Sequence, residues 1–168
     1  PRTGFRERLV LRLAAHRTHA VIAVSEEVAA QTNALAPRVG APSVIANGLP
    51  LPAMRSAAHR EERSRWGIPT DALVIGCLAR FDPVKNLPLL LRAIAALHAA
   101  RPELNVHLLL AGDGTQRAEL VQLARALQIE ARVTMPGMVA DPSAVLAVLD
   151  VCVLTSTTEG TPMSLIEA

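Results

Sequence analysis

Two glutamates in the stretch TSTTEGTPMSLIEA, residues 155–168, are the first candidates for chemistry, because seven residues separate Glu159 from Glu167. Glu159 precedes a predicted helix and Glu167 lies two turns inside it. The two are therefore roughly 10 Å apart at a rise of about 1.5 Å per residue. Hydrolytic carboxylate pairs stand about 5 to 9.5 Å apart. The spacing favours one ligand group for each carboxylate over a shared proton transfer. From spacing alone, a loop acid followed by a surface helix residue is the simpler interpretation.

The turn between the two glutamates could bind an anion. Gly160, Thr161, Pro162, Met163 and Ser164 lie where this helix is predicted to begin. The first backbone N–H groups of a helix have no partner within the helix, and the helix dipole attracts negative charge there. Every helix start has this property, so the turn is suggestive only in combination with other features.

The stretch ARFDPVKN supplies two cations, Arg80 and Lys85, directly after a predicted strand. An arginine can bind two phosphate oxygens through its planar fork, and a lysine acts as a point charge, so the pair suits a diphosphate. The alternative is that both are solvated loop residues. The diphosphate interpretation gains if this loop and the acidic turn follow neighbouring strands.

A glycine pair in AGDGT, Gly112 and Gly114, follows a later predicted strand. The dinucleotide pattern Gly-x-Gly-x-x-Gly is absent because position 117 is Arg, and no P-loop lysine follows. The sequence therefore argues against a nucleotide-dependent dehydrogenase and against a P-loop enzyme. The glycines are better explained by a tight turn from strand to helix.

Alternating strands and helices must position these groups. The strands are nearly continuous apolar runs, which is typical of a parallel sheet covered on both faces. We therefore predict an α/β, doubly wound, Rossmann-like parallel sheet, with ligands at the carboxyl ends of the strands. If its strand order is 3-2-1-4, the basic loop and the acidic turn follow neighbouring strands. The predicted strands span 72–81, 105–114, 131–137 and 150–157, and the predicted helices span 86–102, 115–129, 141–149 and the segment from 161 onward.

A different pattern precedes this sheet. We expect a helix over 5–17, a strand over 19–25, a helix from Ser25 as N-cap to about residue 35, a short strand within 41–52 and some helix within 53–67. Prolines and polar residues follow. We divide the chain into 1–47, the end of a preceding domain; 48–70, a linker; and 71–168, the sheet domain.

Composition and charge narrow the function further. Hydrophobic residues make up 51% of the 168, and aromatic residues only 2%, which disfavours a platform that stacks single-stranded nucleic acid. The net charge is +2, but the first 20 residues carry five arginines (Arg2, Arg6, Arg8, Arg12, Arg17) against one glutamate. This basic stretch could contact the inner face of an anionic membrane, although a solvated helix face is the preferred interpretation.

Cysteine and histidine usage points to an intracellular protein without a bound metal. Cys77 and Cys152 each lie in an apolar run, and we interpret them as buried free thiols in a reducing compartment, which predicts a cytoplasmic location. His16 and His19 have helical ligand spacing, but no Cys or carboxylate cluster joins them, so we predict no metal site.

Together these motifs resemble the retaining glycosyltransferases of family four, which have the GT-B fold of two Rossmann-like domains. The matching pieces occur in family order and cover most of residues 19–168: VIAVSEEV, SVIANGLP, IGCLARFDPVKNLPLLLRAIAAL, LLLAGDGTQRAELVQLARAL and RVTMPGMVADPSAVLAVLDVCVLTSTTEGTPMSLIEA. The combination of the Arg-x4-Lys loop, the Gly-x-Gly turn and the Glu-x7-Glu motif is specific, although each part alone is common.

The resemblance implies transfer of a sugar from a UDP- or GDP-linked donor to a glycan or lipid-linked acceptor, with the anomeric configuration kept and no cofactor or metal. The chain would be the C-terminal, donor-binding half of a GT-B fold, incomplete, from a protein of polysaccharide biosynthesis. The implied site is as follows: Arg80 and Lys85 on the diphosphate, Val139 on the nucleobase through its backbone, Glu159 on the sugar hydroxyls, Gly160 in the same turn, the amides of Met163 and Ser164 near the phosphate or sugar, and Glu167 on the ribose. Arg80, Lys85 and Glu159 would take part in catalysis.

The chain departs from the family pattern at three places. Ala79 and Asn86 replace glycines that are usual beside the basic loop, and ANG replaces the commoner Pro-Asn-Gly; we expect Ala79 and Asn86 to be tolerated. The acceptor-binding domain and the last strands of the donor domain are absent, so we expect the chain alone to be inactive. Two alternatives stay open, namely a GT-B sugar-nucleotide epimerase and a non-catalytic nucleotide-binding module.

Overall fold

The computed structural model describes residues 9–10, 13–14, 18–35, 41–48 and 63–168. Most of the predicted helix 5–17, the basic arginines that precede residue 18, His16 and most of the predicted linker lie outside these residues. The chain divides into two compact units. Unit one contains residues 1–50 and 158–163, and unit two contains residues 51–157 and 164–168. Each unit is described by itself.

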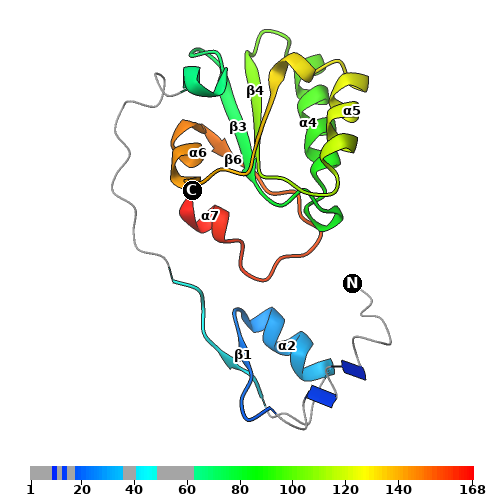
Figure 1. Cartoon of the computed structure of the whole chain (residues 1–168), viewed down its shortest axis with the longest axis vertical. Helices are drawn as coiled ribbons and strands as arrows, with labels where there is room; N and C mark the ends of the chain where they lie inside the picture. Colours follow the sequence, from blue (N-terminus) through cyan, green and yellow to red (C-terminus); the bar gives the residue numbers. More distant parts are fainter. Residues whose placement is uncertain (1–8, 11–12, 15–17, 36–40, 49–62) are drawn as a thin grey trace. The chain divides into compact units, whose positions relative to one another are not determined.

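In the described part of unit one, a small parallel sheet is joined to the helix α2 (Figure 1). β1 (Ile22–Ala23) pairs with β2 (Ser43–Val44), and α2 (Glu26–Leu35) follows β1 directly. The hydroxyl of Ser25 accepts a hydrogen bond from the Val28 N–H at 3.3 Å, which confirms the predicted N-cap. The strand predicted over 19–25 is reduced to β1, whereas the short strand predicted within 41–52 is present as β2.

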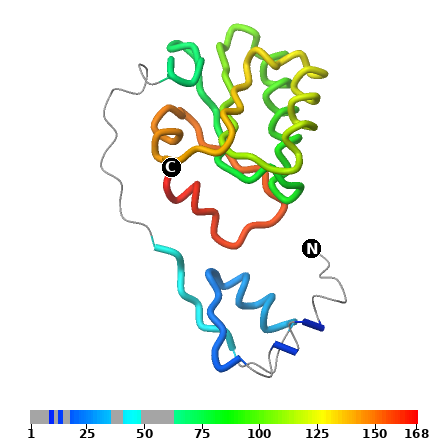
Figure 2. Tube along the Cα trace, in the orientation of Figure 1, coloured from blue at the N-terminus to red at the C-terminus, as the bar shows by residue number. Residues whose placement is uncertain are grey.

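Unit two is built on a four-stranded parallel sheet in the order β5-β4-β3-β6. This is the order 3-2-1-4, the condition under which the basic loop after β3 and the segment after β6 follow neighbouring strands. Its strands are β3 (Leu73–Leu78), β4 (Val106–Ala111), β5 (Val133–Gly137) and β6 (Val151–Cys152). Its helices are α4 (Leu87–Ala100), α5 (Arg117–Ala126), α6 (Pro142–Val148) and α7 (Met163–Glu167), the last of which begins with a residue of unit one, and its 3-10 turns are η2 (Ser64–Trp66), η3 (Pro83–Lys85) and η4 (Glu130–Arg132). The trace in Figure 2 follows this alternation of strand and helix along the chain.

Both faces of this sheet are buried, which explains the continuous apolar runs in its strands. Side chains alternate between the faces, so Ile75 and Cys77 pack toward α4 and α5, whereas Val74 packs toward α6. Figure 1 shows α4 and α5 together on one face of the sheet and α6 on the other. The predicted doubly wound arrangement is confirmed.

The last strand departs most from the prediction, because β6 pairs over Val151–Cys152 alone instead of 150–157. After Val153 the segment leaves the ladder and bonds to the loop that follows β3; the Thr157 N–H, for example, donates to the Val84 carbonyl at 2.9 Å. These bonds replace ladder bonds, so the apolar run continues without a strand. Cys152 is correspondingly half-buried rather than buried.

The loops after β3 and β4 touch through their main chains. A Cβ atom at Gly112, where φ is +134°, would overlap the carbonyl oxygen of Ala79, and one at Gly114 would lie 2.6 Å from the Phe81 carbonyl oxygen. The Phe81 N–H donates to the Asp113 carbonyl at 2.8 Å across this contact. The two glycines thus allow the predicted tight turn and also let the next loop lie directly against it.

We expect Gly112→Ala to destabilise unit two by about 3 kcal/mol, because the new methyl group meets backbone atoms at a φ that favours glycine. Urea unfolding of the complete protein, meaning this chain with whatever sequence flanks it, measures the effect. Gly48→Ala is the matched control, because no atom lies within 4 Å of a Cβ built there. Equal unfolding midpoints for the two variants would contradict the main-chain contact.

His107 should make the free energy of unfolding decrease as the pH falls. Burial first, and the charge of Arg132 second, hold the pKa of this histidine below its usual value, and its Nε2 lies 2.9 Å from the Thr134 hydroxyl. The unfolded chain therefore binds the proton more readily than the folded one. The stabilisation is complete above the unfolded pKa of about 6.5 and is lost as the pH falls below it. His107→Gln should flatten the dependence of the unfolding free energy on pH between about 7.5 and 5.5, and an unchanged slope would exclude this histidine as its source.

Candidate functional site

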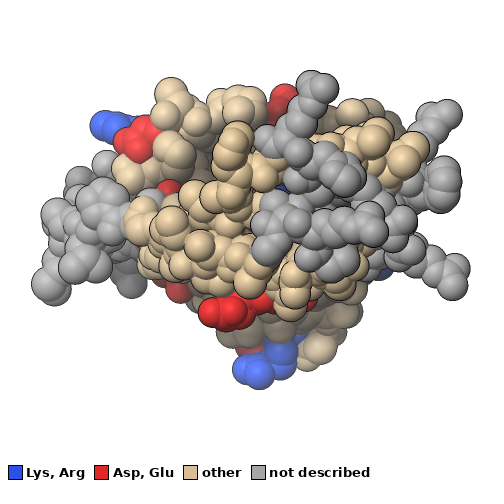
Figure 3. All heavy atoms as spheres, turned by 90° about the horizontal axis from the view of Figure 1, so that it is seen from below, with Lys and Arg blue, Asp and Glu red and all other residues tan. Residues whose placement is uncertain are grey.

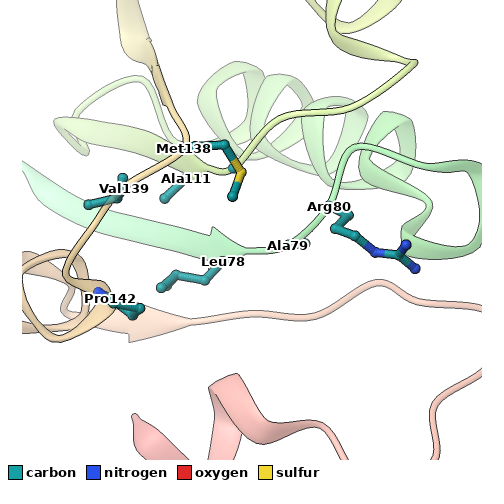
Figure 4. A pocket seen from close by; sticks show the side chains of 8 residues that line it. Leu78, Ala79, Arg80, Ala111, Met138, Val139 and Pro142 are labelled. Atoms are coloured by element: carbon teal, nitrogen blue, oxygen red, sulfur yellow. The ribbon is translucent and has the colours of Figure 1, made fainter.

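The carboxyl ends of β3, β4 and β5 meet at one edge of unit two, where a pocket of about 160 Å³ opens. Ligands of open parallel sheets bind at this edge. The side chains around the pocket are mainly apolar (Figure 4). The lining residues are Leu78, Ala79, Arg80, Ala111, Gly112, Met138, Val139 and Pro142. Two of the predicted site residues, Arg80 and Val139, are therefore brought together here.

Arg80 is the charged group of the pocket. Its side chain is 82% exposed, and its Nη2 lies 3.0 Å from Oδ2 of Asp82. An ion pair this exposed contributes at most about 1 kcal/mol, so a ligand with two negative charges can take the guanidinium from it. In Figure 4 Arg80 lies at the opposite end of the pocket from Val139 and Pro142, so a polar end and an apolar end are separated.

Lys85 ends the 3-10 turn η3 on the same loop and is half-buried. The Thr155 hydroxyl donates to the carbonyls of Lys85 at 3.0 Å and Asn86 at 3.1 Å, which ties the basic loop to the segment after β6. Asn86 adopts the left-handed conformation, with φ 48° and ψ 41°, and α4 begins directly after it. Asparagine is among the residues that tolerate this conformation, which explains why it can replace the usual glycine.

Val139 lies in the segment between β5 and α6, after Gly137. It is half-buried and packs against the core on the α6 face. The helix that follows begins where the sequence predicted, because the Asp141 carboxylate accepts a hydrogen bond from the Ser143 N–H at 2.9 Å and Pro142 occupies the first turn. This cap fixes the direction in which the chain leaves the pocket.

The acidic turn belongs partly to unit one. Glu159, Gly160 and Met163 fall in that unit, where the Thr161 hydroxyl donates to the Val24 carbonyl at 3.0 Å. A Cβ at Gly160 would lie 3.3 Å from a methyl group of Val24. The segment thus packs against the end of β1, a position that spacing in the sequence could not reveal.

The rest of this motif belongs to unit two. Ser164 and Glu167 are both half-buried, and the carbonyl of Ser164 accepts a weak hydrogen bond from the Cys152 thiol at 3.9 Å. Glu167 is the last residue of α7, which has five residues. The prediction that Glu167 lies two turns inside a helix is therefore wrong. The cause is that α7 begins only at Met163, after Pro162, so little more than one turn precedes Glu167.

Two residues of unit two, Met138 and Arg63, were not predicted from the sequence to have a role. Met138 is 77% exposed at the mouth of the pocket, and its one signal in the sequence is an apolar residue directly after the glycine that ends a predicted strand. Arg63 is 4% exposed although it falls in the predicted linker. Its Nη2 pairs with the Asp150 carboxylate at 2.8 Å beside a second hollow of about 410 Å³, at the amino ends of β3 and β6.

Figure 3 shows one face of the molecule, on which the coloured acidic and basic side chains form a few small groups and no large charged patch. Within the described ranges, no helix is long and apolar enough to cross a membrane. The described residues also contain no group of three or more His, Cys, Asp or Glu side chains placed to hold a metal ion.

Comparison with known proteins gives a family. The family described as glycosyl transferases group 1 matches residues 58–168. EpsF of Bacillus subtilis (strain 168) is 35% identical over 127 residues, which cover 74% of this chain and 33% of EpsF. The lipopolysaccharide core biosynthesis glycosyltransferase LpsE of Rhizobium meliloti (strain 1021) is 35% identical over 98 residues, which cover 58% of this chain and 27% of LpsE.

Solved structures agree on the fold. HepE of Anabaena, crystallised with UDP and glucose, has a TM-score of 0.85 at 24% identity, over 98% of this chain and 46% of that protein. The chain has the fold of the C-terminal half of a GT-B protein. It spans about a third of the length of EpsF and about half that of HepE.

Thr155 gives a test of how the basic loop is held. Thr155→Val keeps the side-chain shape but removes the hydroxyl that donates to the Lys85 and Asn86 carbonyls, so we expect affinity for inorganic pyrophosphate to fall about two- to tenfold. Calorimetry on the complete protein measures it. Thr157→Val is the control, because that hydroxyl is exposed and its bond to the Val84 carbonyl is longer, at 3.3 Å. Equal affinities of both variants and the parent would show that the loop does not depend on this hydroxyl.

Proposed function

We propose, from the premise that this chain belongs to the family of glycosyl transferases group 1, that the complete protein transfers a sugar from a nucleotide-diphosphate sugar to an acceptor. The anomeric configuration is kept in this proposal. The chain described above supplies the donor-binding part. The aligned region covers 33% of EpsF. The reaction and its stereochemistry are therefore proposed for the complete protein and not for these 168 residues alone.

The observation that carries the proposal is the pocket at the carboxyl edge of the sheet, with Arg80 at one end and an apolar wall at the other. A nucleotide-diphosphate sugar has this division, because its base is flat and weakly polar while its diphosphate is doubly charged. Lys85 lies on the same loop as Arg80, which supplies a second cation for the diphosphate.

In this reaction the cations would stabilise the charge that develops on the departing diphosphate. As the bond from the anomeric carbon to the diphosphate oxygen breaks, positive charge develops on the sugar and negative charge grows on the departing diphosphate. Cations that are already in position stabilise this charge more strongly in the transition state than in the ground state. We assign this role to Arg80 and Lys85.

The acidic turn takes the remaining parts of the donor. We assign the sugar hydroxyls to Glu159, beside Gly160, and the ribose hydroxyls to Glu167. The amides of Met163 and Ser164 lie in the first turn of α7, where backbone N–H groups lack helical partners and suit phosphate or sugar oxygens. Val139 offers its main chain to the base.

The acceptor is a glycan or a lipid-linked sugar in this proposal, and the product belongs to a surface polysaccharide or glycolipid. LpsE, to which the chain is similar, is named for lipopolysaccharide core biosynthesis. We further propose that the reaction is cytoplasmic, takes place without a metal ion, and needs sequence beyond these 168 residues for turnover.

Donor binding tests the assignment of Glu167. In the complete protein, Glu167→Ala should weaken binding of the preferred UDP- or GDP-sugar about tenfold or more, because a hydrogen bond to a charged group is lost. Isothermal calorimetry measures it. Arg92→Ala is the control, because Arg92 is an exposed residue of α4. Undiminished binding by the Glu167 variant would remove this residue from the donor site.

The same protein separates the proposal from its alternatives. A transferase consumes the donor only when an acceptor is added, and nuclear magnetic resonance of the product reports the anomeric configuration. A sugar-nucleotide epimerase converts the donor without an acceptor. A binding module leaves the donor unchanged, and a protein that binds no nucleotide sugar contradicts the proposal entirely.

A further inference from the structure

The carboxylate of Asp82 is directed away from the turn that it could stabilise. Asp82 lies directly before the 3-10 turn η3, in an extended conformation with φ −121° and ψ 161°, where an aspartate can accept hydrogen bonds from the first N–H groups. Its side chain accepts none of them. Instead, its Oδ2 lies 3.0 Å from Nη2 of Arg80, the charged group of the pocket.

A second aspartate of the same unit shows the capping that Asp82 lacks. Asp141 also precedes a proline and a helical segment, and its Oδ1 accepts hydrogen bonds from the N–H of Ser143 at 2.9 Å and from the Ser143 hydroxyl at 2.6 Å. An aspartate before a proline can therefore cap the segment that follows. Capping does not explain the position of the Asp82 carboxylate, so its contact with the arginine calls for another explanation.

The Asp82 carboxylate is also incompletely paired. Its side chain is 26% exposed, and its Oδ1 is buried without a hydrogen-bond partner among the described residues. The main chain holds it in place, because the Asp82 N–H donates to the Arg80 carbonyl at 2.9 Å and the Asp82 carbonyl accepts from the Lys85 N–H at 3.1 Å. A ligand that takes the guanidinium of Arg80 would therefore leave a largely buried carboxylate unpaired, which costs free energy.

In the proposed function, the diphosphate at Arg80 gains negative charge during the reaction. The bond from the anomeric carbon to the phosphate oxygen breaks, and its electron pair stays on that oxygen. The acceptor oxygen bonds to the anomeric carbon and releases its proton. The phosphate that carried the sugar changes from a diester with a single negative charge into a terminal phosphate with about 1.5 to 2 charges. An unpaired carboxylate nearby repels this product more strongly than the donor.

We propose that Asp82 is a positioning residue that promotes release of the nucleoside diphosphate product. The proposal rests on the proposed function and adds to it a residue that acts through Arg80. Before a ligand binds, the carboxylate holds the guanidinium beside the pocket. Once the product has formed, the carboxylate competes with it for the guanidinium and repels its additional charge.

The test is calorimetry of the complete protein with UDP and UDP-glucose, and with GDP and GDP-mannose. Asp82→Asn keeps the shape of the side chain and removes its charge. For the pair that the parent binds, this variant should tighten binding of the nucleoside diphosphate about five- to tenfold, but binding of the nucleotide sugar only about two- to threefold. Asp82→Ala, a second uncharged variant, should shift the ratio of the two affinities in the same direction. Asp82→Glu keeps the charge and should keep the ratio of the parent.

Glu130→Gln is the matched control. It removes the same charge from an exposed ion pair, in which Glu130 Oε2 lies 4.0 Å from Nε of Arg125, and it lies before β5, at the amino ends of the strands. Both affinities should equal those of the parent in this variant.

The outcomes separate this inference from the function on which it rests. If both uncharged variants leave the ratio of the two affinities unchanged, Asp82 has no role in product release, because a purely structural effect does not distinguish product from donor. The same ratio in Asp82→Glu as in Asp82→Asn would show that the charge is not the cause, and would also overturn the proposal. Binding of none of the four nucleotides by a folded parent would overturn the proposed function itself, and thermal unfolding confirms that each variant is folded.

Discussion

The direct contact between the main chains that follow β3 and β4 is the constraint on which the ligand edge of unit two depends. Gly112 and Gly114 have no side chains, so the backbone of Ala79 and Phe81 can lie against them. Phe81 is 1% exposed and anchors the loop in the core. Arg80 therefore stands between two fixed residues while its own side chain reaches solvent. The backbone that carries this cation is therefore held in place, and only the exposed side chain has to reorient to meet a ligand at the pocket.

The opposite edge of the same sheet is held by a buried cation. Arg63 donates to the carbonyls of Val148 at 3.1 Å and Ala72 at 2.9 Å in addition to its ion pair with Asp150, whose other oxygen accepts from the Val74 N–H at 2.7 Å. The Asp150 side chain is 38% exposed, so water screens the pair from one side, but the buried Arg63 would lose three partners at once if it were displaced. The exposed pair that Arg80 makes contributes at most about 1 kcal/mol. The more buried ion pair thus lies at the amino ends of the strands, and the edge with the pocket at Arg80 carries an ion pair weak enough to exchange.

The sequence was sufficient for what depends on periodicity and capping. Apolar runs without polar alternation predicted buried parallel strands, and Asp141 predicted the start of α6. The sequence was insufficient where tertiary contacts determine the end of a strand or the burial of a side chain. Val153 and Leu154 continue the apolar run after Cys152, and the predicted strand extended to residue 157, but hydrogen bonds to the loop at 84–86 take this segment out of the sheet. Arg63 lies in a polar stretch that has the composition of a linker, and only the fold shows that it is buried. The roles assigned to Glu159 and Glu167 stay predictions.

The two ends of the pocket make different contributions to a transferase. In the proposed function, the apolar end around Val139 is assigned to groups of the donor that do not change during the reaction, so its binding energy would be the same in the ground and transition states. The end at Arg80 is assigned to the diphosphate, on which charge would grow only as the bond breaks. Changes at the apolar end should therefore alter KM more than kcat, whereas changes at the cationic end should lower kcat. Because one sheet edge carries both ends, binding of the base in the proposed function would also position the diphosphate against the cation.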